Sequence, residues 1–228
     1  MNGILYGVSV GPGEPELMTI KAVRIIEKCE VISVPRTRNE NTLALDIASQ
    51  ICDISKKEIV YIDYKMSREK SVRESFHRET AERLAAILST GKSIAFLNIG
   101  DVSIYSTFSY IAELIAAQGF CTEYIPGVTS FCAAAAAVGK PLVCGKNPLI
   151  IAPASSKELE SLLKSSGTTV IMKSSAASEK VMESLSGRDV FAVSECGLSG
   201  EKIYRCFEEI PRNCGYFTTI IVSGDADE

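Results

Sequence analysis

The stretch VSVGPGEPELMTIKA, residues 8–22, decides the fold because it joins an apolar strand to an amphipathic helix through a very tight turn. Two glycines and two prolines fall within the five positions 11–15. Glycine-rich turns between a strand and a helix let a ligand approach the backbone closely. The same residues also suit a plain strand–helix turn, so the rest of the sequence has to decide between these two interpretations.

Outward from that turn, short apolar runs alternate with helical patterns through the first half of the chain. Strands are predicted at 4–10, 30–34, 58–62, 93–98 and 121–125. Helices are predicted at 15–29, 42–52, 67–90 and 105–118. Such alternation predicts a mostly parallel sheet with helices on both of its faces.

The second half has more strands and fewer helices. Strands are predicted at 148–153, 168–173, 189–194, 202–207 and 217–223, with helices at 155–165 and 175–186. No helix separates the last two strands, which predicts an antiparallel hairpin between them and therefore a mixed sheet. The predicted fold class is α/β, with two α/β domains, residues 1–120 and 121–228, and a ligand cleft between them.

Composition and charge restrict the classes of partner. The chain of 228 residues is 46% hydrophobic and 23% charged, as is ordinary for a globular protein. A net charge of −4 argues against a nucleic-acid partner, which needs a basic face. No apolar run reaches the roughly 18–20 residues of a membrane span, and the first residues read as a strand rather than a signal peptide. We therefore expect a cytoplasmic protein with no membrane partner.

Neither the cysteines nor the histidine predicts a metal site or a catalytic base. The eight cysteines form no CxxC pair and match no zinc spacing, and most lie in apolar stretches, as Cys132 does. We expect them to be reduced and buried, with an iron–sulfur or zinc site as the alternative. The one histidine, His77, lies in the charged stretch 67–84 and is expected on a solvated helix face.

The opening turn does not fit the common phosphate-binding fingerprints. Pro12 and Pro15 lack the N–H groups that a pyrophosphate would use, and Pro35 stands where a dinucleotide fold would place an acidic residue. The GxxxxGK[ST] pattern of a P-loop is absent as well. The turn is therefore shaped for close approach without being built for phosphate.

A second signal, IGDVSIYST at 99–107, directly follows a predicted strand. Gly100 and Asp101 would then lie at the carboxyl end of a parallel strand, where open α/β sheets bind ligands. Asp101 can hold a ligand's ammonium or hydroxyl groups there. Alternatively, Asp101 or Ser103 only caps the next helix.

A third signal, IPGVTSFCAAAAAVGKPL at 125–142, begins with a Pro-Gly turn. Thr129 and Ser130 then start a helix that is rich in alanine. Small side chains let another surface come close, and the first N–H groups of a helix have no partner within it. The alternative is tight helix packing without a ligand.

In this order and spacing, VGPGEPELMTIKAVRIIEKCEVI, GD…YST and EYIPGVTSF resemble the tetrapyrrole (corrin/porphyrin) methylase family, over nearly the whole chain. Within that family, LYGVSVGPGEPELMT, VPRT (34–37), IYSTFSYI and IPGVTSFCAAAA look most like the branch that methylates C-20 of precorrin-2 or cobalt-factor II in cobalamin biosynthesis. The resemblance implies a two-domain α/β enzyme, a homodimer, that binds S-adenosylmethionine in the cleft between its domains and acts on a tetrapyrrole.

The resemblance also implies the cofactor-binding residues. They are Pro12, Gly100, Asp101, Ile104, Thr129 and Ser130, with Met172, Cys196 and Thr218 from weaker motif matches. The chain departs from the family pattern in having Ser9 where many relatives have glycine, Glu14 where aspartate is commoner, and Val102 in place of the proline of GDP. The loss of that proline is expected to affect the loop that holds the cofactor.

Methyl transfer from a sulfonium requires no metal, covalent nucleophile or strong base. Alignment of the reacting atoms alone can supply about 7–11 kcal/mol, so we name no catalytic base. The substrate's carboxylates would find partners in Arg36, Arg38 and Lys173, which are otherwise ordinary surface charges.

Two other functional classes stay open at this point. One is a sibling methylase that acts at another ring carbon, or the diphthine-forming member that modifies a protein. The other is a nucleotide-binding module without catalysis. Whether cobalt is already in the ring is also open, and only the many cysteines, which suit an anaerobic cell, favour the cobalt form.

Overall fold

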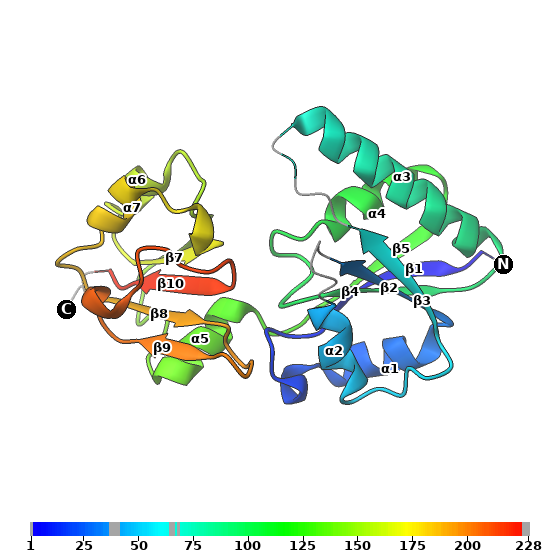
Figure 1. The fold of residues 1–228 in the computed structure, drawn as a ribbon, viewed down its shortest axis with the longest axis horizontal. Coiled ribbons are helices and arrows are strands. Elements are labelled where there is room, and N and C mark those ends of the chain that lie inside the picture. Colours follow the sequence, from blue (N-terminus) through cyan, green and yellow to red (C-terminus); the bar gives the residue numbers. More distant parts are fainter. Residues whose placement is uncertain (1, 37–41, 64–66, 68, 225–228) are drawn as a thin grey trace. The chain divides into compact units, whose positions relative to one another are not determined.

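The computed structural model describes residues 2–36, 42–63, 67 and 69–224, which fall into two compact units, Met1–Thr129 and Ser130–Glu228. Within these residues each unit has one five-stranded sheet with helices packed on it, so the predicted α/β class is confirmed (Figure 1). The predicted division at 120/121 would place strand β5 (Cys121–Ile125) in the second unit. In the structure β5 pairs with β1 (Ile4–Ser9) in the first sheet, and the division follows β5 instead of preceding it.

The first sheet is parallel throughout, as predicted. Its strand order is β3-β2-β4-β1-β5. The other three strands are β2 (Val31–Arg36), β3 (Glu58–Asp63) and β4 (Ile94–Asn98). Because β1 lies between β4 and β5, the loop that leaves its carboxyl end is flanked by the loops that leave both neighbours.

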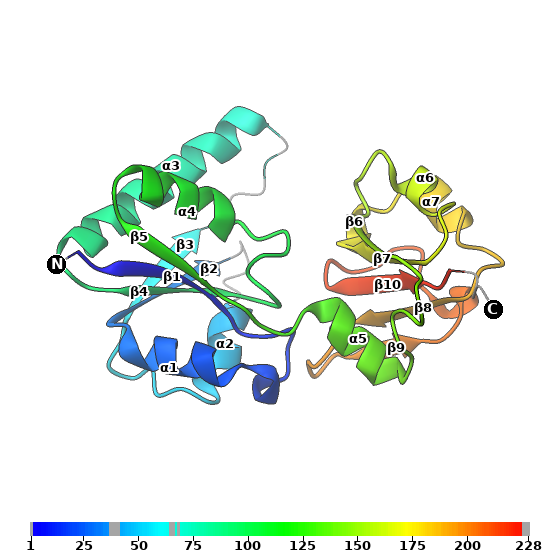
Figure 2. The same cartoon turned by 180° about the vertical axis from the view of Figure 1, so that it is seen from behind.

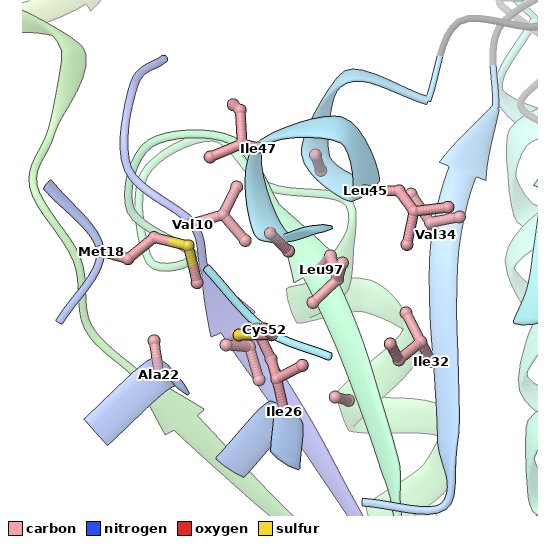
Figure 3. Close-up of a cluster of buried hydrophobic side chains, with 14 of the residues drawn as sticks. Val10, Met18, Ala22, Ile26, Ile32, Val34, Leu45, Ile47, Cys52 and Leu97 are labelled. Carbon is pink, nitrogen blue, oxygen red and sulfur yellow. The ribbon is translucent and has the colours of Figure 1, made fainter. Parts of the chain in front are cut away.

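Helices cover both faces of this sheet (Figures 1 and 2). Successive side chains of β4 point to opposite faces, and both sets are apolar. Ile94 and Phe96 pack into one apolar cluster, and Ala95 and Leu97 pack into another. The cluster around Leu97 is drawn in Figure 3. The helices are α1 (Ile20–Lys28) and α2 (Leu43–Ser49) on the Leu97 face, and α3 (Lys70–Ser89) and α4 (Phe108–Ala117) on the Phe96 face.

The helix predicted at 15–29 is divided in the structure. A 3₁₀ turn, η1 (Pro15–Leu17), begins at the proline, and the backbone is then extended at Met18 and Thr19 before α1 starts. The Thr19 hydroxyl accepts a hydrogen bond from Ala22 N at 3.1 Å and so caps α1. The Met18 side chain packs in the apolar cluster on the Leu97 face of the sheet (Figure 3).

The second sheet is mixed, with the order β6-β7-β10-β8-β9. Its strands are β6 (Leu149–Pro153), β7 (Thr168–Met172), β8 (Val190–Ser194), β9 (Lys202–Tyr204) and β10 (Thr218–Val222). The predicted hairpin between the last two strands is wrong. The hairpin joins β8 to β9, while β10 lies antiparallel between β7 and β8. The connection from β8 to β9 is the shorter one, which favours pairing of these two neighbours in sequence.

Helices also lie on both faces of the second sheet. Helices α6 (Leu159–Leu162) and α7 (Glu179–Glu183) are shorter than predicted and contribute to one apolar cluster, whereas α5 (Ser130–Val138) packs on β8 and β10 (Figure 1). Two 3₁₀ turns, η2 (Ser174–Ala176) and η3 (Phe207–Glu209), complete the unit. In the described part of the chain, no helix combines the length and apolar character needed to cross a membrane.

Candidate functional site

The three sequence signals meet at one edge of the first sheet. The opening turn, the GD loop and the IPG loop leave the carboxyl ends of β1, β4 and β5, which are parallel neighbours. Gly100 N donates to Gly11 O at 2.7 Å, so the first two loops are joined through their main chains. Gly11 and Gly100 have φ values of 75° and 72°, in the left-handed region that favours glycine. The glycines therefore suit the backbone conformation in which these two loops meet.

Asp101 connects the GD loop to the IPG loop. One carboxylate oxygen accepts hydrogen bonds from the N–H and the hydroxyl of Ser103, and the other accepts from Gly127 N at 2.7 Å. Burial alone would raise the pKa of the Asp101 carboxyl, but the bonds from Ser103 and Gly127 outweigh it and hold this pKa below its usual value. Asp101 is therefore an ionised acceptor that organises the main chain of both loops, in addition to holding its own turn.

Ser9, at the end of β1, contacts both flanking loops. Its hydroxyl donates to Ile125 O at 2.7 Å and accepts from Val102 N at 2.9 Å. The Ser9 side chain is completely buried. Ser9 and Val102, two of the three departures from the family pattern, thus meet in one hydrogen bond.

Close packing in this region also explains Gly127. A Cβ atom there would lie 2.4 Å from the Ser9 Cβ and 3.0 Å from Gly100 O. The preceding Pro126 carbonyl accepts a hydrogen bond from the Thr19 hydroxyl at 3.4 Å. The IPG loop is therefore held by contacts from α1, β1 and the GD loop.

The remaining first-unit predictions lie in or beside these loops. Pro12 is buried in the opening turn, Ile104 N donates to Asp101 O at 3.1 Å, and Thr129 is half-buried at the end of the IPG loop. Next to Ile104, Tyr105 has a φ of 49°, which is strained for a bulky side chain. The structure thus places Pro12, Gly100, Asp101, Ile104 and Thr129 together on three adjoining loops.

The second-unit predictions also share one edge, that of the second sheet. Met172 ends β7 and Cys196 follows β8, while Thr218 begins the antiparallel strand between them. The Thr218 hydroxyl lies 2.7 Å from the Ser194 hydroxyl. The hydroxyl of Ser130, the first residue of α5, accepts from the Thr219 hydroxyl at 3.4 Å.

Two residues at this second edge have strained backbones. Lys173 and Glu195 have φ values of 56° and 51° and directly follow β7 and β8. Ser174, buried beside Lys173, donates its hydroxyl hydrogen to Thr218 O at 2.8 Å. Strain of this kind persists only where surrounding contacts enforce it, and it is common at ligand-binding sites.

The predicted substrate-binding residues are not gathered in the same way. The Arg36 Nε atom lies 2.8 Å from an Asp63 carboxylate oxygen, and its guanidinium lies over the Tyr61 ring, 4.9 Å from the centroid. The Lys173 Nζ atom lies 5.9 Å from the centroid of the Tyr216 ring. Arg38 falls outside the described residues.

The predictions for histidine and cysteine need correction. His77 is half-buried, because its ring stacks on that of Tyr110 at a centroid distance of 4.9 Å. Burial and the neighbouring Arg73 charge lower the pKa of His77. Only three of the eight cysteines are buried, and Cys132 is exposed, because it lies on the outer side of α5 while its alanine neighbours pack inward. All eight lie in the described residues, and none forms a disulfide.

No cluster of three or more metal-ligating side chains occurs in the described ranges. Sequence reasoning missed the contacts of Ser9, Ser174 and Ser194, which are ordinary serines in their local sequences. A buried hydroxyl that joins distant loops has no local signature. The only available signal was that Ser9 departs from the family pattern.

A family model described as Tetrapyrrole (Corrin/Porphyrin) Methylases matches residues 4–210. The cobalt-precorrin-2 C(20)-methyltransferase of Salmonella typhimurium is 30% identical, over 98% of this chain and 97% of that protein.

Two solved structures share the fold. The X-ray structure of a cobalamin biosynthetic enzyme, cobalt precorrin-4 methyltransferase, has a TM-score of 0.79 at 22% identity, covering 96% of this chain and 94% of that one. A uroporphyrin-III C-methyl transferase from Thermus thermophilus, complexed with S-adenosyl homocysteine, has a TM-score of 0.71 at 21% identity, covering 97% of both chains. At these identities the likeness shows the fold alone.

Proposed function

Because the chain belongs to the tetrapyrrole (corrin/porphyrin) methylase family, we propose that it transfers a methyl group from S-adenosylmethionine to a ring carbon of a tetrapyrrole. The observation that carries this proposal is the meeting of the opening turn, the GD loop and the IPG loop at one edge of the first sheet. S-adenosylmethionine supplies an electrophilic methyl group on its sulfonium. A structure with S-adenosyl homocysteine in a protein of the same fold supports this choice of donor.

The proposed substrate is cobalt-precorrin-2 (cobalt-factor II in its oxidised form), methylated at C-20 in cobalamin biosynthesis. The support is the near full-length similarity to the cobalt-precorrin-2 C(20)-methyltransferase of Salmonella typhimurium. The sequence motifs VPRT and IYSTFSYI favour the same branch of the family. Precorrin-2 without cobalt is the alternative substrate.

We propose that residues at each of the two sheet edges contact the cofactor. In the first unit the edge suits a ligand that approaches main chain, since Gly11 and Gly100 expose no side chain at the turn. The proposed contacts are Pro12, Gly100, Asp101, Ile104 and Thr129 in the first unit, and Ser130, Met172, Cys196 and Thr218 in the second. Asp101 would in addition hold the loops in place, because its two oxygens accept three hydrogen bonds.

No side chain is proposed as a base. Asp101 is held ionised and engaged by Ser103 and Gly127, so it is a poor proton acceptor. The chain's contribution would be to bind and align the reacting groups, which can supply about 7–11 kcal/mol. Arg36, Arg38 and Lys173 are proposed to bind substrate carboxylates, and for Arg36 this would require sharing or exchange of its Asp63 partner.

The test is a methyl-transfer assay with radiolabelled S-adenosylmethionine and precorrin-2, with and without inserted cobalt. The expected result is one labelled methyl group at C-20, with faster turnover of the cobalt form. Label at another ring carbon would identify a sibling methylase. No labelled tetrapyrrole from either form, together with preferential binding of ATP or NAD in calorimetry, would reject methyl transfer in favour of a nucleotide-binding module.

We further propose that the protein is a cytoplasmic homodimer. Light scattering of the purified protein is expected to give about twice the chain mass of 24.6 kDa. A mass near that of one chain would reject the dimer without affecting the proposed chemistry.

A further inference from the structure

One hydroxyl group connects the strand at the centre of the first sheet to both loops beside it. The Ser9 hydroxyl donates to Ile125 O at 2.7 Å and accepts from Val102 N at 2.9 Å. Both partners are main-chain groups, and both are more than ninety residues away in sequence. Ser9 and Val102 are 0% and 1% exposed, so this hydrogen bond is shielded from competing water.

Asp101 joins the same two loops by a second route. Its carboxylate accepts from Gly127 N at 2.7 Å, two residues beyond the carbonyl that Ser9 binds. Gly100 N, bound to Gly11 O at 2.7 Å, ties the opening turn to the GD loop. Ser9, the GD loop and the IPG loop therefore form a closed ring of hydrogen bonds, and the opening turn is joined to that ring through Gly100.

We propose that Ser9 is a positioning residue for cofactor binding, which acts by holding the GD loop and the IPG loop at a fixed separation. The proposal rests on the proposed function, because the residues that these loops present are the proposed cofactor contacts Gly100, Asp101 and Thr129. The Ser9 hydroxyl is bonded on both sides within the protein, so it acts through the loops and contacts no ligand itself.

Val102 has a defined part in this arrangement because its N–H group fills the acceptor site on Ser9. A proline at position 102 would lack that N–H group. Serine at position 9 and a residue other than proline at position 102 therefore belong together.

The experiment compares the affinity for S-adenosylhomocysteine, measured by calorimetry, among wild type, S9A, V102P and the S9A/V102P double variant. Binding to S9A is expected to be about tenfold weaker, because the Val102 N–H group loses its buried acceptor. V102P is expected to weaken binding by a similar factor. The double variant should bind no more weakly than the poorer single variant, because the Val102 N–H group that S9A leaves unpaired is itself absent, while the Ile125 carbonyl loses the same donor as in S9A.

Ser33 provides a matched control. It is a buried serine on β2 of the same sheet, and its hydroxyl has no hydrogen-bond partner within the described residues. S33A should bind S-adenosylhomocysteine as wild type does. Unfolding midpoints of all variants are measured alongside, so that a general loss of stability is separated from a loss of affinity.

Wild-type affinity in S9A, or strictly multiplicative losses in the double variant, would overturn the proposal. If wild-type protein itself fails to bind S-adenosylhomocysteine, the proposed function fails instead. Amide hydrogen exchange then decides the positioning role, since S9A should speed exchange at Val102 and Gly127 whereas S33A should not. The same exchange measurement replaces the V102P arm if that variant does not fold.

Discussion

Asp101 has an ordinary local sequence and an unusual environment. Nothing in IGDVSIYST distinguishes a helix cap from a ligand-binding carboxylate, and the sequence left both roles open. The structure shows a third arrangement, in which the carboxylate bonds its own turn through Ser103 and a distant loop through Gly127. The second contact could not be predicted, because it depends on the side-by-side order of β4, β1 and β5.

Asp101→Asn should lower the free energy of unfolding by about 1–3 kcal/mol at pH 7, because the amide nitrogen would face an N–H group of Ser103 or Gly127. The pKa of Asp101 is lowered in the folded protein, so the stability it contributes is present above the unfolded value of about 3.9 and is lost as the pH falls through the folded pKa. The difference between wild type and variant, measured by urea unfolding, should therefore shrink below about pH 4. Asp53→Asn is the control at an exposed turn, where hydrogen bonds from Ser55 also lower the pKa of Asp53 but no distant loop is held, so a smaller loss of stability is expected.

Gly127→Ala should destabilise the protein by about 1–3 kcal/mol, because the new methyl group would overlap Ser9 and approach Gly100 O. Gly119→Ala separates this overlap from backbone strain, since Gly119 has a φ of 86° and a Cβ there would meet no atom within 4 Å. Only Gly127→Ala is expected to weaken S-adenosylhomocysteine binding as well. Equal effects of the two variants on binding would contradict a special role for the IPG loop.

Helices and strands were largely predictable because their patterns are local. The five strands of the first sheet and their parallel pairing follow from regular alternation with helices. The partner of β10 was not predictable in this way, since its antiparallel placement between β7 and β8 depends on contacts across the unit. The division of the first helix at Thr19 was missed because Pro15 also suits the start of a continuous helix.

Thr19→Ala tests the start of α1. The variant should lose about 1 kcal/mol of unfolding free energy, because Ala22 N loses its capping oxygen and the Pro126 carbonyl loses its longer bond from the same hydroxyl. Thr19→Ser retains the hydroxyl and should restore most of that loss. Urea unfolding of the two variants decides the point, and equal losses would assign the effect to the threonine methyl group instead.

Each of the two units contains both buried and exposed cysteines, so their reactivity can be used to follow the unfolding of each unit. Cys29 and Cys52 are buried in the first unit and Cys214 in the second, whereas Cys121, Cys132 and Cys144 are exposed. Burial, opposed by nearby lysines, raises the pKa of the Cys29 thiol to about 12. The thiolate is the reactive form of cysteine. Cys29 is therefore unreactive both because reagents cannot reach it and because its thiol stays protonated.

Labelling of the native protein with a thiol reagent, followed by mass spectrometry, should therefore modify Cys121, Cys132 and Cys144 first. The three buried thiols should react only as denaturant opens their units. Different denaturant midpoints for Cys29 and Cys214 would show that the units unfold separately. Rapid labelling of Cys29 in native protein would contradict the packing described for α1 and β2.

The left-handed backbones of Tyr105, Lys173 and Glu195 have a consequence for protein engineering. Glycine at such positions commonly relieves about 1–2 kcal/mol of steric conflict. A laboratory selection for heat resistance alone should therefore enrich glycine at all three positions. Each substitution would remove a side chain from the loops that follow β4, β7 and β8, where the cofactor contacts are proposed, so such heat-resistant variants are expected to turn over poorly.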